Sequence, residues 1–409
     1  MSGTEEEFRR VFEGHVLGLS DALEVLGCQL NQAMQTPGAN TVVYRRNGQD
    51  ALVLAFKRDG GYAGIHFGPG LDDNYLVQLT AAFRAPRPRH VMSVVFFSTA
   101  PTTGWWRYRD RFQILAMPPE APRPPHVFAG VHPALLEVPY NGSEIDALDE
   151  FRGAVAAREV NRLLSALLRG TEDRLGQFAR QDWVVLAETD DDDSQRWRSH
   201  FGQLGYTWRG GRATREPNFT PIPDGTIQLG TVPKDDYYAK QGISELDVLA
   251  LPDSLEACLD SYFELPANEQ DKALRWCHWL NHARQVAALS PSASIIAAVQ
   301  SVEALLPPVV APEHCETCGR TIGPSIGMRF RQFLEAYAPG ESYARYRDLL
   351  YRSRSRLAHG GALLTGELRH LAFRDFVPKA WGEREDGEGA LMIARLAGAN
   401  WLLRRRQVP

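Results

Sequence analysis

The chain has 409 residues, of which 44% are hydrophobic and 23% are charged, and its formal net charge is −5 at pH 7. A chain of this length exceeds what one hydrophobic core ordinarily organises, so we expect two domains. The negative net charge disfavours a protein that coats nucleic acid regardless of sequence, although it is compatible with a local basic site.

Several global features predict a cytoplasmic protein with no membrane partner. No apolar run approaches the roughly 18 residues that a membrane helix needs. The first residues, MSGTEEEFRR, lack the apolar segment of a secretory signal, and the five cysteines are too scattered for a disulfide framework. The glycine-rich segment 60–70 does not match the spacing of a phosphate-binding loop, so we expect no nucleotide cofactor.

The first 230 residues are predicted to contain both helices and strands. Apolar residues at helical spacing predict an opening helix over about 5–35. A β-hairpin is predicted at TVVY-RRNGQD-ALVLAF, because Asn47 and Gly48 suit the positive φ angles of a tight turn. Residues 91–97 predict a buried strand, and the aromatic and basic run 104–109 fits an amphipathic strand better than a base-stacking surface. Another helix is predicted from about residue 143.

The second part of the chain is predicted to be helical. Residues 216–233 contain four prolines and two glycines, which predicts a linker over 216–245. Beyond it, helical periodicity predicts helices over 254–265, 268–289, 292–306, 325–337, 343–358 and 389–406. The predicted fold class is therefore α+β, in which a β-containing N-terminal half, residues 1–230, precedes an all-α bundle over residues 246–409.

The most informative segment is DLLYRSRSRLAHGG, residues 348–361. Its leucines can face a core, whereas its three arginines cannot all be buried with them. Gly360 and Gly361 follow His359 directly, at the point where a helix would end. The pattern therefore places a histidine at a helix C-terminus, within a region (320–360) that holds eight arginines and three carboxylates.

Arg354 and His359 together suit the cleavage of RNA by its own 2′-hydroxyl. Histidine can move protons near neutral pH, arginine offers a fork of donors to a phosphate, and the reaction requires no cofactor. On a helix the two residues lie about 140° apart, so the arginine side chain or a bend must bring them together, while Ser355 shares the face of His359. An arginine followed by a histidine after four to six intervening residues also occurs elsewhere by chance: Arg10/His15, Arg84/His90 and Arg275/His282.

The segment RSRLAHGG, preceded by DLLY, resembles the ribonuclease signature of HEPN domains, particularly those of the Apea-like group. SIIAAVQSVEALLPP, residues 294–308, resembles an earlier helix of that group. HCETCGR and MRFRQFLEAY are similar to the cysteine pair and the arginine-bearing helix that lie between them. The resemblance covers residues 246–409 and implies a helical ribonuclease domain.

The resemblance also implies specific roles and partners. Arg354 would stabilise the phosphate and His359 would act as acid or base, with Arg352 and Arg356 as auxiliary phosphate contacts. Glu303 would either form a hydrogen bond into the site or be a helix-surface carboxylate. The family implies RNA as the substrate, a homodimer in which two Arg/His pairs meet, and use as a toxin in phage defence by abortive infection.

Alternatives to catalysis remain open. The helical part could be a non-catalytic HEPN module that binds RNA or a protein, and the Arg/His pair could be only a capped helix end. If the domain is a nuclease, we expect the N-terminal half to sense a trigger or to restrain it, because an unrestrained ribonuclease would harm its host.

Cys315 and Cys318 form a CxxC turn, which supplies half of the four ligands of a structural zinc site. Cys277, His278 and His282 are candidates for the remaining ligands, and a second subunit is another source. A metal-free turn and a redox pair are the alternatives.

Overall fold

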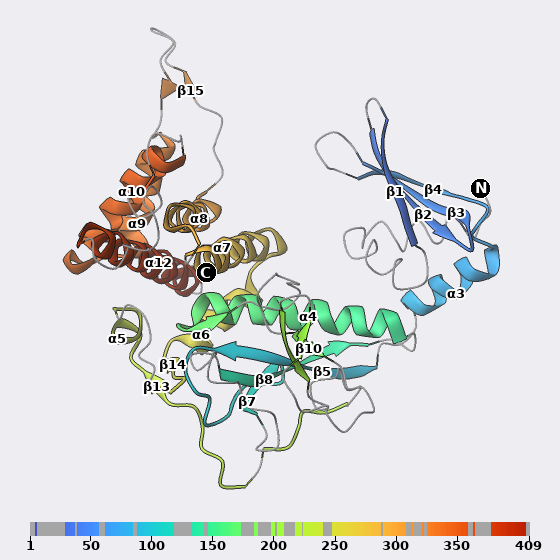
Figure 1. Ribbon diagram of the computed structural model, residues 1–409, viewed down its shortest axis with the longest axis horizontal. Helices are drawn as coiled ribbons and strands as arrows, with labels where there is room; N and C mark the ends of the chain where they lie inside the picture. Colours follow the sequence, from blue (N-terminus) through green and yellow to red (C-terminus); the bar gives the residue numbers. More distant parts are fainter. Residues whose placement is uncertain are drawn as a thin grey trace. The chain divides into compact units, whose positions relative to one another are not determined.

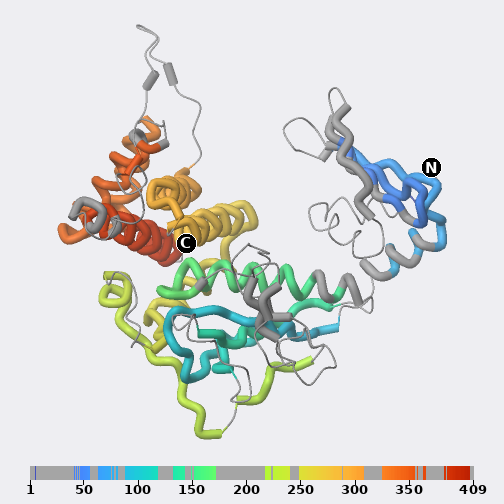
Figure 2. Tube along the Cα trace, in the orientation of Figure 1, coloured from blue at the N-terminus to red at the C-terminus, as the bar shows by residue number. Residues whose placement is uncertain are grey.

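The structure is a computed structural model, and Figure 2 distinguishes the segments that it describes. These are residue 5 and residues 29–36, 39–56, 62–84, 88–117, 132–142, 146–172, 184–186, 198–200, 203–207, 217–222, 224–239, 248–287, 289–307, 313–314, 321–322, 325–358, 363–364 and 378–405. Within these segments, every helix is too short or too polar to cross a lipid bilayer.

The backbone packs into two compact units. The first comprises residues 1–93, 137–157 and 213–220, and the second comprises residues 94–136, 158–212 and 221–409. The second unit thus contains both the C-terminal helices and part of the β-containing region. The predicted α+β class is confirmed, whereas the domain division at 216–245 stays a prediction.

Four antiparallel strands in the order β1-β2-β3-β4 form a sheet in the first unit. They are β1 (Gln29–Thr36), β2 (Ala39–Arg46), β3 (Gln49–Phe56) and β4 (Tyr62–Phe67). The predicted hairpin is confirmed, because β2 pairs with β3 through a two-residue turn in which Asn47 and Gly48 have φ angles of 52° and 80°. Such positive angles match the twist of the flanking strands.

Two features of this unit differ from the sequence prediction. The opening helix is predicted to continue to residue 35, but Gln29–Thr36 is strand β1, because its backbone pairs with β2. Residues 6–28 of that predicted helix lie outside the described residues. Helix α3 (Asp73–Arg84) is not predicted by the sequence reading; it buries Leu76 and Thr80, which are four residues apart on one helical face.

A five-stranded sheet has the order β6-β7-β8-β5-β9. Its strands are β5 (Arg89–Ser98), β6 (Trp106–Tyr108), β7 (Phe112–Ala116), β8 (His132–Asn141) and β9 (Thr171–Glu172). Strand β5 confirms the strand predicted at 91–97. Strand β6 confirms the amphipathic strand, since Trp106 and Tyr108 are buried while Arg107 between them is partly exposed.

Helix α4 (Asp146–Leu167) confirms the helix predicted from about residue 143. It approaches the sheet closely, because a Cβ on Gly153 would overlap Met92 of β5 and lie 3.0 Å from the ring of Tyr140 of β8. Smaller sheets contain β10 (Val184–Leu186), β11 (Arg198–His200), β12 (Gln203–Thr207), β13 (Thr231–Val232), β14 (Leu251–Pro252), β15 (Glu313–His314) and β16 (Thr321–Ile322).

Most of the C-terminal helices lie together as a bundle in Figure 1. The C-terminal helices are α5 (Lys234–Ala239), α6 (Leu255–Glu264), α7 (Ala267–Val286), α8 (Pro291–Ala304), α9 (Ile326–Tyr337), the 3-10 helix η3 (Glu341–Tyr343), α10 (Ala344–Ala358) and α12 (Pro378–Arg405). All six predicted helices are confirmed. Helix α5 falls in the predicted linker, and α12 begins at Pro378 instead of residue 389.

Helices α7 and α12 pack closely through a buried tryptophan. The Nε1 atom of Trp276 donates to the carbonyl oxygen of Ala394 at 3.1 Å. A Cβ on Gly398 would overlap the indole ring of Trp276, which is fully buried. The missing side chain at position 398 therefore allows the two helices to approach one another.

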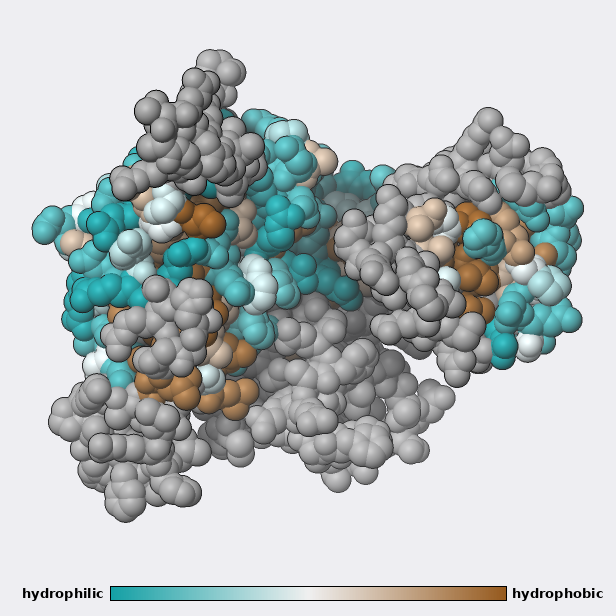
Figure 3. All heavy atoms as spheres, turned by 90° about the horizontal axis from the view of Figure 1, so that it is seen from above, coloured by the Kyte–Doolittle hydropathy of each residue, from teal (hydrophilic) through white to brown (hydrophobic). Residues whose placement is uncertain are grey.

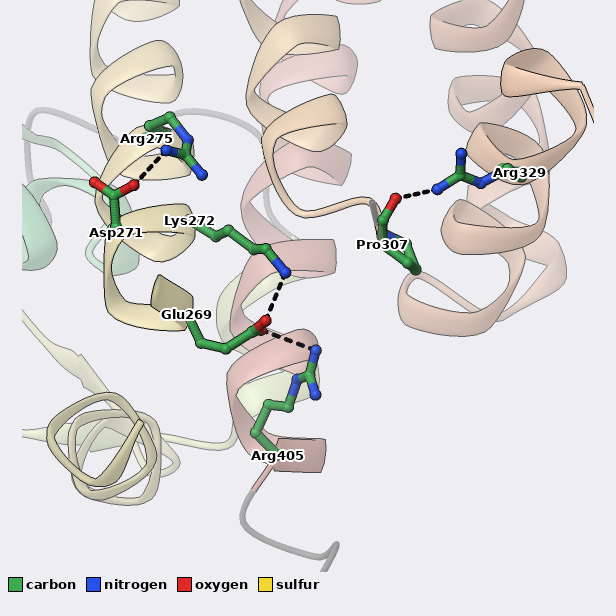
Figure 4. A network of polar contacts seen from close by, with 7 residues as sticks. All are labelled: Glu269, Asp271, Lys272, Arg275, Pro307, Arg329 and Arg405. Carbon is green, nitrogen blue, oxygen red and sulfur yellow. Dashed lines mark hydrogen bonds and ion pairs between the residues drawn. The ribbon is translucent and has the colours of Figure 1, made fainter. Parts of the chain in front are cut away.

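Polar contacts hold the rim of the bundle, as Figure 4 shows. Glu269 at the start of α7 accepts from Lys272 at 2.5 Å and from Arg405, in the last turn of α12, at 3.0 Å. Arg329 of α9 donates to the carbonyl oxygen of Pro307, just beyond α8. These contacts join the ends of helices that are distant in the sequence.

Candidate functional site

Helix α10 carries Arg352, Arg354 and Arg356, the three arginines of the segment DLLYRSRSRLAHGG. Its sequence, ARYRDLLYRSRSRLA, contains mainly alanine, arginine and leucine, which favour a helix, and no β-branched residue. Leu350, Ser353 and Leu357 are buried at a spacing of three and four residues. This places one face of α10 on the bundle and leaves the arginines on the other faces.

Contacts at the start of α10 fix its orientation. Arg345 donates to Asp386 of α12 at 2.7 Å, and Arg347 donates to the carbonyl oxygens of Ala338 and Gly340 at 2.7 Å each. The second arginine thereby satisfies carbonyl groups at the end of α9, which a helix terminus leaves without intrahelical partners. The helical part of the candidate segment is therefore carried by a helix that contacts two neighbours.

Arg354 and Glu303 form an ion pair between helices α10 and α8. The Nε atom of Arg354 donates to Oε1 of Glu303, and the two side chains are 27% and 33% exposed. Glu303 lies in the last turn of α8, whose first turn is capped by Ser290 through a bond from the Ala293 amide of 3.1 Å. Of the two readings of Glu303 that the sequence leaves open, its contact with Arg354 agrees with a hydrogen bond into the candidate site.

The geometry of the pair leaves part of the guanidinium group available. Within the described residues the ion pair engages only Nε of Arg354, so its two Nη groups are not used there. A guanidinium group held at one edge can still present parallel N–H donors to a phosphate. The carboxylate of Glu303 would also repel that phosphate, so Arg354 would favour phosphate binding at this site while Glu303 opposed it.

Arg352 lies on another side of α10. Its side chain is 69% exposed, its Nη2 atom lies 3.9 Å from a carboxylate oxygen of Asp348, and its Nε donates to the carbonyl oxygen of Asp348. Positions 352 and 354 are about 200° apart on a helix, so the two arginines do not converge. The structure thus does not bring Arg352 to Arg354. Arg356 is four residues from Arg352 and belongs to the same helical face by position.

The remaining candidate residues are only partly described. The backbone of Ser355 and Arg356 is helical, while their side chains lie outside the described residues. His359 also lies outside them and directly follows Ala358, the last helical residue of α10. The assignment of His359 as the catalytic partner of Arg354 therefore stays a prediction.

The metal-binding candidates are only partly among the residues that the structure describes. Cys315 and Cys318 lie outside the described residues, between strands β15 and β16, whose pairing brings His314 opposite Thr321. Among the residues that the structure describes, no group of three or more potential ligands could hold a metal ion. The two thiols could supply half of the four ligands of a structural zinc site.

The helix α7 candidates for zinc point to different environments. Cys277 is fully buried, whereas His278 and His282 are exposed and their parallel rings lie 6.4 Å apart. The three side chains therefore do not all face one point, and the choice among them as further zinc ligands stays a prediction. Position on the helix explains this, because residues 277 and 278 face directions about 100° apart.

No family model, curated protein or solved structure matches this chain. The assignment of function therefore rests on the residues and geometry described above.

Proposed function

We propose that the helical C-terminal part is a metal-independent endoribonuclease of the HEPN type, with Arg354 and His359 as its catalytic pair. The ion pair between Arg354 and Glu303 carries this proposal. It holds the guanidinium group of Arg354 at a partly exposed position. Arg354 lies about one helical turn before Ala358, and His359 follows Ala358 directly. A positioned cation beside an available imidazole is what phosphate-ester cleavage requires.

In the proposed reaction the ribose 2′-oxygen attacks the adjacent phosphorus atom. One proton leaves the 2′-hydroxyl and one reaches the departing 5′-oxygen: His359 acts as the base in the first transfer or as the acid in the second, and water serves the other. Arg354 donates from its Nη groups to the phosphate oxygens as negative charge develops on them. The O2′–P bond forms and the P–O5′ bond breaks, so the products are a 2′,3′-cyclic phosphate and a 5′-hydroxyl.

We include a homodimer through the helical domain in the proposal. Because Arg354 and His359 lie about 140° apart on an ideal helix, a second subunit could supply the group that completes each site. The helical part exposes large apolar side chains, including Ile326 and Met328 of α9 and Leu289 after α7. Figure 3 shows hydrophobic side chains gathered in small groups on a mostly hydrophilic face. Such groups are compatible with an interface.

The proposed role as a toxin-like effector of antiviral defence follows from the resemblance to HEPN domains alone. The proposed cytoplasmic location follows from the cysteine usage, and the proposed restraint by the N-terminal half follows from the harm that an unrestrained ribonuclease would do to its host. A structural zinc at Cys315 and Cys318 is compatible with this proposal and has no part in the chemistry.

A non-catalytic module that binds RNA or a protein is the second candidate. The same ion pair favours it, because Glu303 neutralises much of the charge that Arg354 would offer to a transition state. In that case Arg354 would join α10 to α8, and the basic surface would only bind. The two functions differ in whether the RNA chain is cut.

The decisive assay incubates the purified full chain with RNA in excess chelator and analyses the product ends. We expect cyclic-phosphate ends, with activity lost in His359→Ala and in Arg354→Ala while both variants remain folded. The double variant Arg275→Ala/His282→Ala is the matched control, because it likewise removes one arginine and one histidine, both of them exposed on α7. Binding without cleavage would select the second candidate, and retained cleavage in His359→Ala would move the site elsewhere.

A further inference from the structure

An exposed arginine of helix α9 lies against an aromatic ring of helix α10. The Cζ atom of Arg331 is 4.2 Å from the centre of the Tyr351 ring, and the tyrosine is partly exposed. Gly327, one turn before Arg331, borders the same side chain, since a Cβ at this position would lie 3.6 Å from the hydroxyl oxygen of Tyr351. The Tyr351 side chain therefore packs on the first half of α9 and holds the guanidinium group of Arg331 by a cation–π contact.

Arg331 differs from the neighbouring arginines in its contacts. The other arginines of α9 and α10 whose side chains are described each donate to a carbonyl or carboxylate oxygen: Arg329, Arg345, Arg347, Arg352 and Arg354. Among the described residues Arg331 has no such oxygen partner, and Glu335, one turn further on in α9, forms no ion pair with it. A cation–π contact attracts the charge without using the N–H groups, so the donors of Arg331 stay available to an anion.

The packing of α9 on α10 places Arg331 on the flank of α10 that leads to Arg354. The two helices lie side by side in Figure 1 and run antiparallel, because Arg347 near the start of α10 donates to the carbonyl oxygen of Ala338 at the end of α9, whereas Tyr351 contacts the first half of α9. Tyr351 and Arg354 are about 60° apart around the helix and about 4.5 Å apart along it. Arg331 and Arg354 therefore present two cations along one flank of α10.

We infer that Arg331, held by Tyr351, binds a phosphate of a single-stranded RNA next to the linkage at Arg354. The inference rests on the proposed function, because it takes the substrate RNA as the ligand. Each linkage of such a strand carries one negative charge, so two cations along one flank match its backbone. The excess of eight arginines over three carboxylates in residues 320–360 also suits a polyanion. A contact of this kind fixes the position of the strand without reading its sequence.

Binding of a single-stranded oligonucleotide with 2′-O-methyl riboses tests the site, because this ligand cannot attack its own phosphate. The full chain is titrated by fluorescence anisotropy at several salt concentrations. We expect Arg331→Gln to weaken binding about fivefold and to reduce the slope of log Kd against log salt concentration by about 0.7. Arg275→Gln is the matched control and should bind as the unsubstituted chain does, because Arg275 is an exposed arginine of α7 paired with Asp271.

Substitutions of Tyr351 test whether its ring positions Arg331. Tyr351→Leu removes the ring and should weaken binding roughly twofold to fourfold, whereas Tyr351→Phe keeps the ring and should restore the full affinity. The double variant Arg331→Gln/Tyr351→Leu should bind no more weakly than Arg331→Gln, because the ring acts through the arginine. Effects of Tyr351→Leu and Arg331→Gln that add in full would show that the ring does not position Arg331.

Two results would overturn the inference: an unchanged Kd and salt dependence in Arg331→Gln, or no binding of the oligonucleotide to the unsubstituted chain. Should Arg331→Gln fail to fold, an undiminished affinity in Tyr351→Leu has the same meaning. Failure of the proposed function gives a different result. Binding that depends on Arg331, without cleavage of ordinary RNA, would refute the nuclease and leave this site in place, whereas cleavage with binding independent of Arg331 would refute only this site.

Discussion

Replacing Glu303 by glutamine removes the negative charge of the ion pair that positions Arg354 and keeps the shape of the side chain. The two side chains are 27% and 33% exposed, so the pair lies between the exposed and the buried case. Exposed pairs contribute about 0.2–1 kcal/mol and hydrogen bonds to charged groups about 1.5–3 kcal/mol. We therefore expect Glu303→Gln to lower the free energy of unfolding by about 1 kcal/mol.

A double-mutant cycle with Glu303→Gln and Arg354→Gln, measured by urea unfolding, isolates the interaction between the two residues. We expect a coupling energy of about 1 kcal/mol. Glu335→Gln is the matched control, because Glu335 is an exposed carboxylate on α9. If the changes in unfolding free energy of the two single variants add up to that of the double variant to within about 0.3 kcal/mol, Glu303 and Arg354 are not coupled and the reasoning fails.

The same variant has opposite expected effects on RNA binding and on turnover. Removing the carboxylate of Glu303 removes a charge that repels phosphate, so RNA should bind several-fold more tightly. Arg354 would also lose the partner that orients it, so the rate of the bound complex should fall. If the affinity for RNA and the turnover rate both rose or both fell in Glu303→Gln, Glu303 would not act by positioning Arg354.

Three further predictions concern the stability and reactivity of the chain. Gly398→Ala should lower the free energy of unfolding by roughly 1–3 kcal/mol, because the new Cβ would overlap the buried ring of Trp276. Gly387→Ala in the same helix should raise it by about 0.5–1 kcal/mol, because the new Cβ would meet no atom within 4 Å. Chemical unfolding of the two variants measures both changes. Burial lowers the pKa of His132 below its usual 6.5, so the unfolded chain binds more protons than the folded chain near this pH. The free energy of unfolding should therefore decrease as the pH falls below about 6.5. If His132→Gln left the dependence of stability on pH unchanged, this prediction would be wrong. Burial raises the pKa of Cys258 to about 12, so this thiol should resist alkylation at pH 8 until the chain unfolds, and mass spectrometry of the labelled peptide would reveal premature reaction.

Much of the fold could be predicted from local signals. The Asn47-Gly48 turn and the helices of the bundle follow from turn chemistry and from the spacing of apolar residues. Strand β1 could not be predicted in this way, since its backbone pairing with β2 overrides the helical pattern that precedes it. The start of α12 was missed because glycines and charges weaken the helical signal before residue 389.

The candidate sites show the same division between local and tertiary information. Arg354 stands out in the sequence because a histidine and two glycines follow it, but its pairing with Glu303 joins residues 51 positions apart. Other contacts between distant segments have no local pattern either, since Arg284 of α7 and Arg395 of α12 both donate to carbonyl groups at the end of α4.

The most direct test of the central claim is cleavage of an RNA in which the preferred cleavage site carries a single 2′-deoxyribose. The account predicts that the unsubstituted protein, in excess chelator, cuts the all-ribose strand and leaves the deoxyribose linkage intact, because the attacking oxygen is missing. Cleavage at the deoxyribose linkage would contradict a reaction in which the RNA attacks its own phosphate.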